Sequence, residues 1–262
     1  ICACTPRFEE APESEQATVD DKGGIMKDGS VSADGYVINT IQPFSPPFNP
    51  DVKDPARRML PSDLPTIGER LDQRMLDWAW YGGGWKNALA DKPDKTFMHH
   101  HQPFIYFRAY GPSSIGRITH LKDEDDFIAA IEKGTLPAVS FYKPLGKVNL
   151  HPGYTGLKES EEHIFSIVKK IEQSPLWNQS LIVVTFDDAG GFWDHVAPPK
   201  GDRFGPGERI PALIISPVAK KGFIDHTVYD TTSILKLIET KYDLKPLGDR
   251  DAKANDMTNA LE

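Results

Sequence analysis

The chain has 262 residues, of which 39% are hydrophobic, and a formal net charge of −8. This length suits one large α/β domain or two small ones, with a core large enough to need no disulfide or metal staple. The acidic balance and the absence of a Lys/Arg cluster exclude a protein that binds duplex nucleic acid by neutralising its phosphates, and no window approaches the roughly 20 apolar residues of a transmembrane segment.

The beginning of the chain differs in composition from the rest. Residues 1–35 are polar and poor in aromatic side chains, so we expect an exposed or mobile arm there. Residues 36–41 are predicted to form a strand, and residues 43–55 a proline-broken loop. Thr66 and Glu69 have the spacing of a capping box, which predicts a helix that begins there.

Strand and helix patterns alternate over the remainder of the chain. Apolar strands are predicted at 78–81, 136–141, 181–184 and 210–215, and amphipathic helices at 123–133, 159–170 and 232–242. This alternation is typical of the α/β class, in which helices flank a parallel sheet. The run 181–184 is β-branched and does not alternate with polar residues, which predicts a strand buried on both faces of that sheet.

Two adjacent carboxylates, Asp187 and Asp188, follow this last apolar run, and Gly190 and Gly191 come next. In open α/β sheets, ligands bind outside the carboxyl ends of the strands. Paired glycines let the backbone turn sharply and approach a ligand closely. Carboxylate oxygens suit Mg²⁺, Ca²⁺, Mn²⁺ or Zn²⁺. The pattern therefore predicts a metal or phosphate site, with simple capping of the next turn as the alternative.

The histidines add to this prediction. His99, His100 and His101 form an unbroken run, His151 lies in a turn-forming His-Pro-Gly segment, and His195 follows the two acids within a few residues. Neutral imidazole binds cations, and a ring N–H donates to an oxyanion. These histidines are therefore candidates for a metal or phosphate site, and the alternative is a histidine-rich polar loop.

The motifs resemble the bacterial phosphoesterase family that contains non-haemolytic phospholipases C and related acid phosphatases. The resemblance is carried by VVTFDDAGGFWDHVAPP, RIPALIISPVAKKG and YDTTSILKLIE, together with HHQPF and HPGY, and it runs from about residue 36 to about residue 242. It implies an alkaline-phosphatase-like α/β/α sandwich, with residues 36–262 as the C-terminal part of the catalytic domain.

The same resemblance implies roles for individual residues. Asp187 and Asp188 match the paired metal-binding acids of the family. Four histidines match its active-site histidines and form the implied catalytic set: His100, His101, His151 and His195. The first three are expected to contact the phosphoryl group. The implied cofactor is a divalent metal ion, with zinc as the first expectation and calcium or magnesium as the alternatives.

Two elements of the family have no match in the chain. These are a Glu-Asn-Arg-Ser-Phe-Asp-like segment that supplies metal ligands, and a Ser or Thr nucleophile; no glutamate in the chain is followed directly by asparagine. The chain is therefore expected to be the C-terminal part of a longer enzyme, whose N-terminal part is its partner and supplies the nucleophile.

The implied function is that of a phosphoric ester hydrolase. The first expectation is a phospholipase C, which releases diacylglycerol and a phosphorylated headgroup from a phospholipid through a metal-assisted phospho-enzyme mechanism. The alternatives are an acid phosphatase that acts on small phosphomonoesters, and a non-catalytic fragment that lacks the nucleophile. The resemblance also implies a secreted or periplasmic protein.

Overall fold

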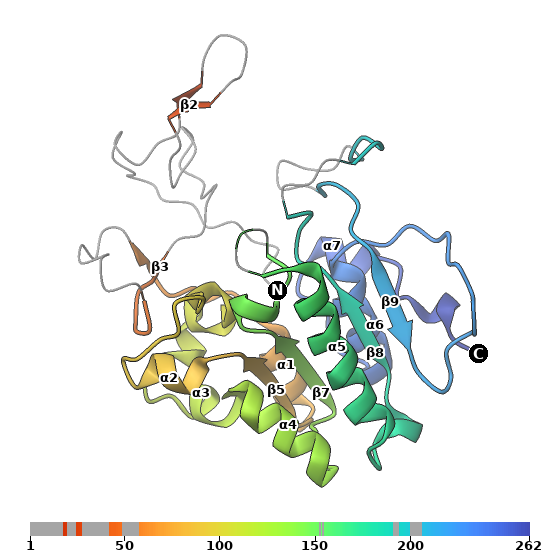
Figure 1. Ribbon diagram of the computed structural model, residues 1–262, viewed down its shortest axis with the longest axis horizontal. Helices are drawn as coiled ribbons and strands as arrows, with labels where there is room; N and C mark the ends of the chain where they lie inside the picture. The colour runs from red at the N-terminus through yellow and green to blue at the C-terminus, as the bar shows by residue number, and fades with distance from the viewer. Residues whose placement is uncertain are drawn as a thin grey trace.

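The computed structural model describes residues 18–19, 25–27, 42–48, 58–151, 153, 155–190, 194–199 and 206–262 (Figure 1). Two short strand pairs lie near the beginning of the chain: β1 (Thr18–Val19) is antiparallel to β2 (Ile25–Lys27), and β3 (Gln42–Pro43) is parallel to β4 (Arg58–Met59). Most of the predicted arm and the predicted strand at 36–41 lie outside the described residues, so both stay predictions. No helix among the described residues is long and apolar enough to cross a membrane.

A three-stranded parallel sheet forms the centre of the molecule. Its middle strand is β5 (Trp78–Gly82), which pairs with β6 (Leu121–Lys122) on one side and with β7 (Val139–Lys143) on the other. The strands predicted at 78–81 and 136–141 are thus confirmed, although β7 begins later and extends further than expected. The last residues of β5 and β7, Gly82 and Lys143, lie opposite each other, so the two carboxyl ends meet at one edge.

Helices cover both faces of this sheet, because the side chains of β5 alternate between two cores. Trp78 and Trp80 pack with α1 (Ile67–Gln73) and α6 (Thr232–Tyr242). Ala79 and Tyr81 pack with α4 (Glu124–Lys133) and α5 (Leu157–Glu172) on the other face. The result is a layered arrangement of helix, sheet and helix, as the α/β prediction requires (Figure 1).

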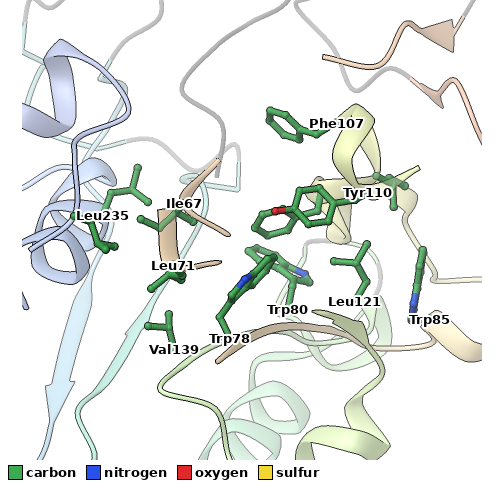
Figure 2. Close-up of a cluster of buried hydrophobic side chains, with 13 residues drawn as sticks. Ile67, Leu71, Trp78, Trp80, Trp85, Phe107, Tyr110, Leu121, Val139 and Leu235 are labelled. Atoms are coloured by element: carbon green, nitrogen blue, oxygen red, sulfur yellow. The ribbon is translucent and has the colours of Figure 1, made fainter. Parts of the chain in front are cut away.

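Aromatic rings dominate the first of these cores (Figure 2). Trp78 and Phe104 have ring centroids 4.8 Å apart, and Trp80 lies 5.8 Å from the same Phe104 ring and 5.4 Å from Phe141. Tyr110 meets Trp78 edge to face. Burying rings of this size contributes roughly 1.5–3 kcal/mol each, so this core is the main anchor of the segments that pack on it.

The helices begin where polar side chains satisfy the first backbone N–H groups. At α1, the Thr66 side chain accepts from the N–H of Glu69 while the Glu69 side chain accepts from the N–H of Thr66, so the predicted capping box is confirmed. Asp123 caps α4. It also accepts from the backbone N–H groups of Gly84 and Lys86 at the start of α2 (Trp85–Leu89), which joins the two helix starts.

The pairing of the last two strands differs from the prediction. β8 (Ile182–Thr185) pairs with β9 (Ala212–Ile215) in an antiparallel register, with Thr185 opposite Ala212. Residues of β8 are only half-buried, and Leu213 on β9 is 61% exposed. The prediction of a strand buried on both faces of a parallel sheet was therefore wrong. A parallel pair needs a crossover connection, usually a helix, and the described residues between β8 and β9 contain none.

Two further helices complete the described fold. α3 (Ile115–His120) leads into β6, and α7 (Asp249–Lys253) packs on α6. The helices predicted at 123–133, 159–170 and 232–242 correspond to α4, α5 and α6, with α5 extending two residues further at each end.

Candidate active site

Three segments from distant parts of the sequence meet beyond the carboxyl ends of β5 and β7. They are the 3-10 turn His99–His101, the end of β7 at Lys143, and the two acids after β8. The Lys143 Nζ lies 2.9 Å from Oδ2 of Asp187. The pKa of His100 responds to the charges of Lys143, Asp187, His151 and Asp188, which shows that these side chains share one neighbourhood.

The histidine turn is held by the aromatic core. The indole Nε1 of Trp80 donates to the carbonyl oxygen of His101 at 2.7 Å in a buried hydrogen bond. Gly82 lets this turn approach the strand end, because a Cβ there would lie 3.4 Å from the same carbonyl oxygen and 3.3 Å from Nε2 of Gln102. At Gly83 a Cβ would meet the backbone N of Leu145 at 2.5 Å, so only glycine fits. The glycines at this predicted strand end therefore bring the site together.

Burial sets the charge of the histidines. It lowers the pKa of both His100 and His101, and that of His101 falls to about 3. The neighbouring Lys143 ammonium acts in the same direction. Their rings lie 4.7 Å apart and nearly perpendicular. At neutral pH each ring is therefore uncharged, with one N–H donor and one acceptor nitrogen.

Some buried polar atoms at this edge lack a partner. Nδ1 of His100 and both amide atoms of Gln102 are buried, and they make no hydrogen bond with the described part of the chain. Gln102 is only 1% exposed. Leaving such an atom unsatisfied costs about 1–3 kcal/mol. This is the pattern of a polar surface that a ligand or another segment completes.

The carboxylate side of the site is more exposed. Partial burial acts to raise the pKa of Asp187, but the charge of Lys143 and the hydrogen bond from it outweigh this effect, and the pKa lies below its ordinary value. Oδ1 of Asp188 accepts from the backbone N–H of Gly190, whose φ is 65°. Asp188 therefore shapes the turn after β8, as the capping alternative expected, while Asp187 faces Lys143.

Asp187 and Asp188 suit a divalent cation by their chemistry, because both supply hard carboxylate oxygens. They do not complete a coordination sphere. In the part of the chain that the structure describes, no group of three or more His, Cys, Asp or Glu side chains is arranged to hold a metal ion. The residues present therefore do not make a whole metal site, and we assign no catalytic step to a metal.

The other two predicted histidines lie on exposed segments. The backbone N–H of His151 donates to the side chain of Asn149, and the N–H of Leu150 donates to Oγ of Ser160 on α5, which fixes this turn near the site. His195 is exposed, and it follows Asp194, which accepts two hydrogen bonds from Arg209 at 2.7 and 2.9 Å. The role of His195 stays a prediction.

Lys143 lies outside the sequence motifs, and Gln102 lies within HHQPF but had no predicted role. A signal for Lys143 was present, because it ends an apolar strand just before Pro144. The argument that places Asp187 at a strand end applies equally to this lysine. For Gln102 the signal was its place in the HHQPF motif, but a glutamine after a histidine run is ordinary in a polar loop, and its burial could not be seen from the sequence.

Comparison with known proteins places the chain in one family. The family model described as "Phosphoesterase family" matches residues 17–245, which is most of the chain. Phospholipase C B of Mycobacterium tuberculosis is 28% identical over 164 residues, covering 52% of this chain and 31% of that protein.

Two further similar proteins are also phospholipases C by name. The non-hemolytic phospholipase C of Pseudomonas aeruginosa is 28% identical over 235 residues, covering 75% of this chain and 32% of that protein. Non-specific phospholipase C6 of Arabidopsis thaliana is 27% identical over 157 residues, covering 47% and 30%. The chain therefore spans about a third of the length of the curated relatives it matches.

Proposed function

Because the chain belongs to the Phosphoesterase family, we propose that it forms part of a phosphoric ester hydrolase that binds the phosphoryl group at the edge formed by His100, His101, Lys143 and Asp187. The observation that carries the proposal is this grouping itself: two neutral imidazoles, a lysine and a carboxylate converge at the carboxyl ends of the strands. The imidazole N–H groups and the ammonium are donors that suit the oxygens of a phosphoryl group, and the Asp187 carboxylate accepts from the ammonium.

Each side chain has a distinct task in this proposal. The rings of His100 and His101 stay neutral, so each offers one N–H to a phosphoryl or leaving-group oxygen. His100 keeps a buried Nδ1 without a partner in the described chain, and a bound oxygen would satisfy it. His151 is exposed beside the pair and is proposed to contact the phosphoryl group as well. His195 is proposed to join this catalytic set from its exposed segment.

A phospholipid is the first proposed substrate. The relatives named above are phospholipases C, and by analogy the products are diacylglycerol and a phosphorylated headgroup. The second candidate is a small phosphomonoester, and the Lys143 ammonium at the site favours it, since a monoester carries more negative charge than a diester.

The remaining parts of the proposal need groups from outside the described residues. A divalent ion, zinc first and calcium or magnesium as alternatives, would be held by Asp187 and Asp188 with ligands from elsewhere. An N-terminal part of the same enzyme would supply a Ser or Thr nucleophile and complete an alkaline-phosphatase-like α/β/α sandwich. We also propose that the protein is secreted or periplasmic.

The test uses protein purified from its native host. Hydrolysis of phosphatidylcholine and of p-nitrophenyl phosphate is measured side by side, with and without added Zn²⁺, Ca²⁺ or Mg²⁺, and the intact masses of all co-purifying chains are recorded. Turnover of either ester supports the hydrolase, and the ratio of the two rates separates the candidates. A sample that turns over neither ester with any of the three ions refutes it and leaves the non-catalytic fragment. Periplasmic and culture fractions test the location.

A further inference from the structure

We propose that Lys143 is the specificity-determining residue of this site, and that its ammonium distinguishes a dianionic phosphomonoester from a monoanionic phosphodiester. The proposal rests on the function proposed above and assigns a role in it to one further residue. It concerns the ratio between the two substrate classes and is independent of which class the enzyme hydrolyses faster.

The backbone of Lys143 is fixed at the centre of the site. It is the last residue of β7 and lies opposite Gly82 in the parallel register. Its carbonyl oxygen accepts from the N–H of Gly83 at 3.0 Å. The backbone of this lysine is therefore held by the central sheet.

Strand alternation directs this side chain toward the histidines. Residues i and i+2 of a strand lie on the same face, so Lys143 shares a face with Phe141. The Phe141 ring stacks on Trp80, whose indole donates to the carbonyl oxygen of His101. Lys143 also contributes to lowering the pKa of both His100 and His101. The ammonium and the imidazole pair therefore lie in the same part of the site.

Lys143 supplies the fixed positive charge of this group. His100 and His101 are neutral at physiological pH because burial depresses their pKa values. The Lys143 side chain is only 22% exposed, and Asp187 lies 2.9 Å from its Nζ. An ammonium has three N–H donors, so it can hold Asp187 and still donate to a phosphoryl oxygen beside it.

The two ester classes differ in the charge that they present to this lysine. A phosphomonoester carries close to two negative charges above its second pKa of about 6 and has three unbridged oxygens, whereas a diester carries one charge on two such oxygens. A partly desolvated ammonium stabilises the first more strongly than the second. Removal of the charge should therefore lower activity on the monoester more than activity on the diester.

The experiment compares p-nitrophenyl phosphate with bis(p-nitrophenyl) phosphate, which share a leaving group and differ in charge. In protein purified from its native host, Lys143→Met should lower the monoester-to-diester ratio of kcat/KM by about tenfold, which is less than the full effect of one lost hydrogen bond to a charged group because the diester loses this donor as well. In Lys143→Arg, which keeps the charge, the ratio should stay within about threefold of the wild-type ratio. Lys147→Met is the matched control, because Lys147 is exposed on the next turn.

An equal loss on both esters in Lys143→Met would overturn the proposal and make Lys143 a mere support for Asp187. Binding of inorganic phosphate at pH 7.5, measured by calorimetry, provides a readout that needs no turnover. Lys143→Met should bind phosphate at least about tenfold more weakly than wild type and Lys147→Met; equal affinities would refute the role. If wild type hydrolyses neither these two esters nor phosphatidylcholine, the proposed function fails, while a loss of phosphate affinity of about tenfold in Lys143→Met still supports Lys143 as the residue that recognises the dianion.

Discussion

The two sides of the candidate site are built in different ways. The histidine side, His99–His101, is attached to the aromatic core through Trp80, and its rings are largely buried. The carboxylate side, Asp187 and Asp188, follows a half-buried strand whose partner β9 exposes Leu213. Burial makes the first side neutral and fixed, while the Lys143 ammonium holds Asp187 on the more exposed second side in its charged form.

This difference matches the chemistry that each side would perform. Hydrogen-bond donors to a phosphoryl group gain from a dry, fixed position, because no reorganisation is needed when the charge develops. Carboxylates that receive a cation from water gain from exposure, because their desolvation cost stays small. Lys143 joins the two sides, since it belongs to the central sheet and pairs with Asp187.

The largest effect is expected at the base of the histidine side. Trp80→Ala should lower the free energy of unfolding by about 3–5 kcal/mol, because it removes a buried ring and the donor to the His101 carbonyl. Urea unfolding measures the change. Leu213→Ala on the exposed carboxylate side should cost less than about 1 kcal/mol. Similar losses in both variants would contradict the difference between the two sides.

The opposite pattern is expected for the carboxylate side. Asp187→Asn should reduce kcat/KM by about 10²–10³-fold and lower the bound metal together with it, while the midpoint of urea unfolding changes little. The side chain is 55% exposed, so its removal leaves the core intact. Asp188→Asn is expected to lose metal and activity in the same way. Asp125→Asn, an exposed acid on α4, is the control, and full activity with normal metal content in both site variants would refute the assignment.

Acid should destabilise the histidine side. The pKa of His101 is depressed by burial to about 3 in the folded protein, whereas an unfolded histidine titrates near 6.5. The stabilising contribution is therefore complete above pH 6.5 and is lost as the pH falls from 6.5 toward 3. Between pH 6.5 and 4.5, the free energy of unfolding of wild type should fall by roughly 2 kcal/mol more than that of His101→Gln. Parallel curves of unfolding free energy against pH would show that this ring is not buried as a neutral imidazole.

An effect of similar size is expected at the glycine turn after β5, which supports the histidine side. Gly83→Ala introduces a Cβ about 2.5 Å from the backbone N of Leu145. The backbone must move to accommodate it, which should lower the free energy of unfolding by about 1–3 kcal/mol. The same movement should weaken phosphate binding. At Gly207 a Cβ meets nothing within 4 Å, so the free energy of unfolding of Gly207→Ala should stay within about 0.5 kcal/mol of the wild-type value. Thermal unfolding of the two variants decides whether close packing at residue 83 supports the site.

Much of the local structure was predictable from the sequence. The Thr66 and Glu69 capping box, the strand at 78–81 and the helix at 232–242 depend on neighbouring residues, and all three are present. The pairing of β8 was not predictable. An apolar run shows that a strand is buried to some extent, but it does not show which strand lies beside it or in which direction.

The same distinction between neighbouring residues and long-range contacts applies to the candidate site. The sequence by itself determined that two acids follow an apolar strand and that histidines gather elsewhere in the chain, because these are patterns of neighbours. Only the tertiary structure decided that Lys143 faces Asp187 and that the pKa values of His100 and His101 are depressed. Ion pairs and burial depend on contacts between residues far apart in the chain, and such contacts exist only once the sheet and its helices have packed.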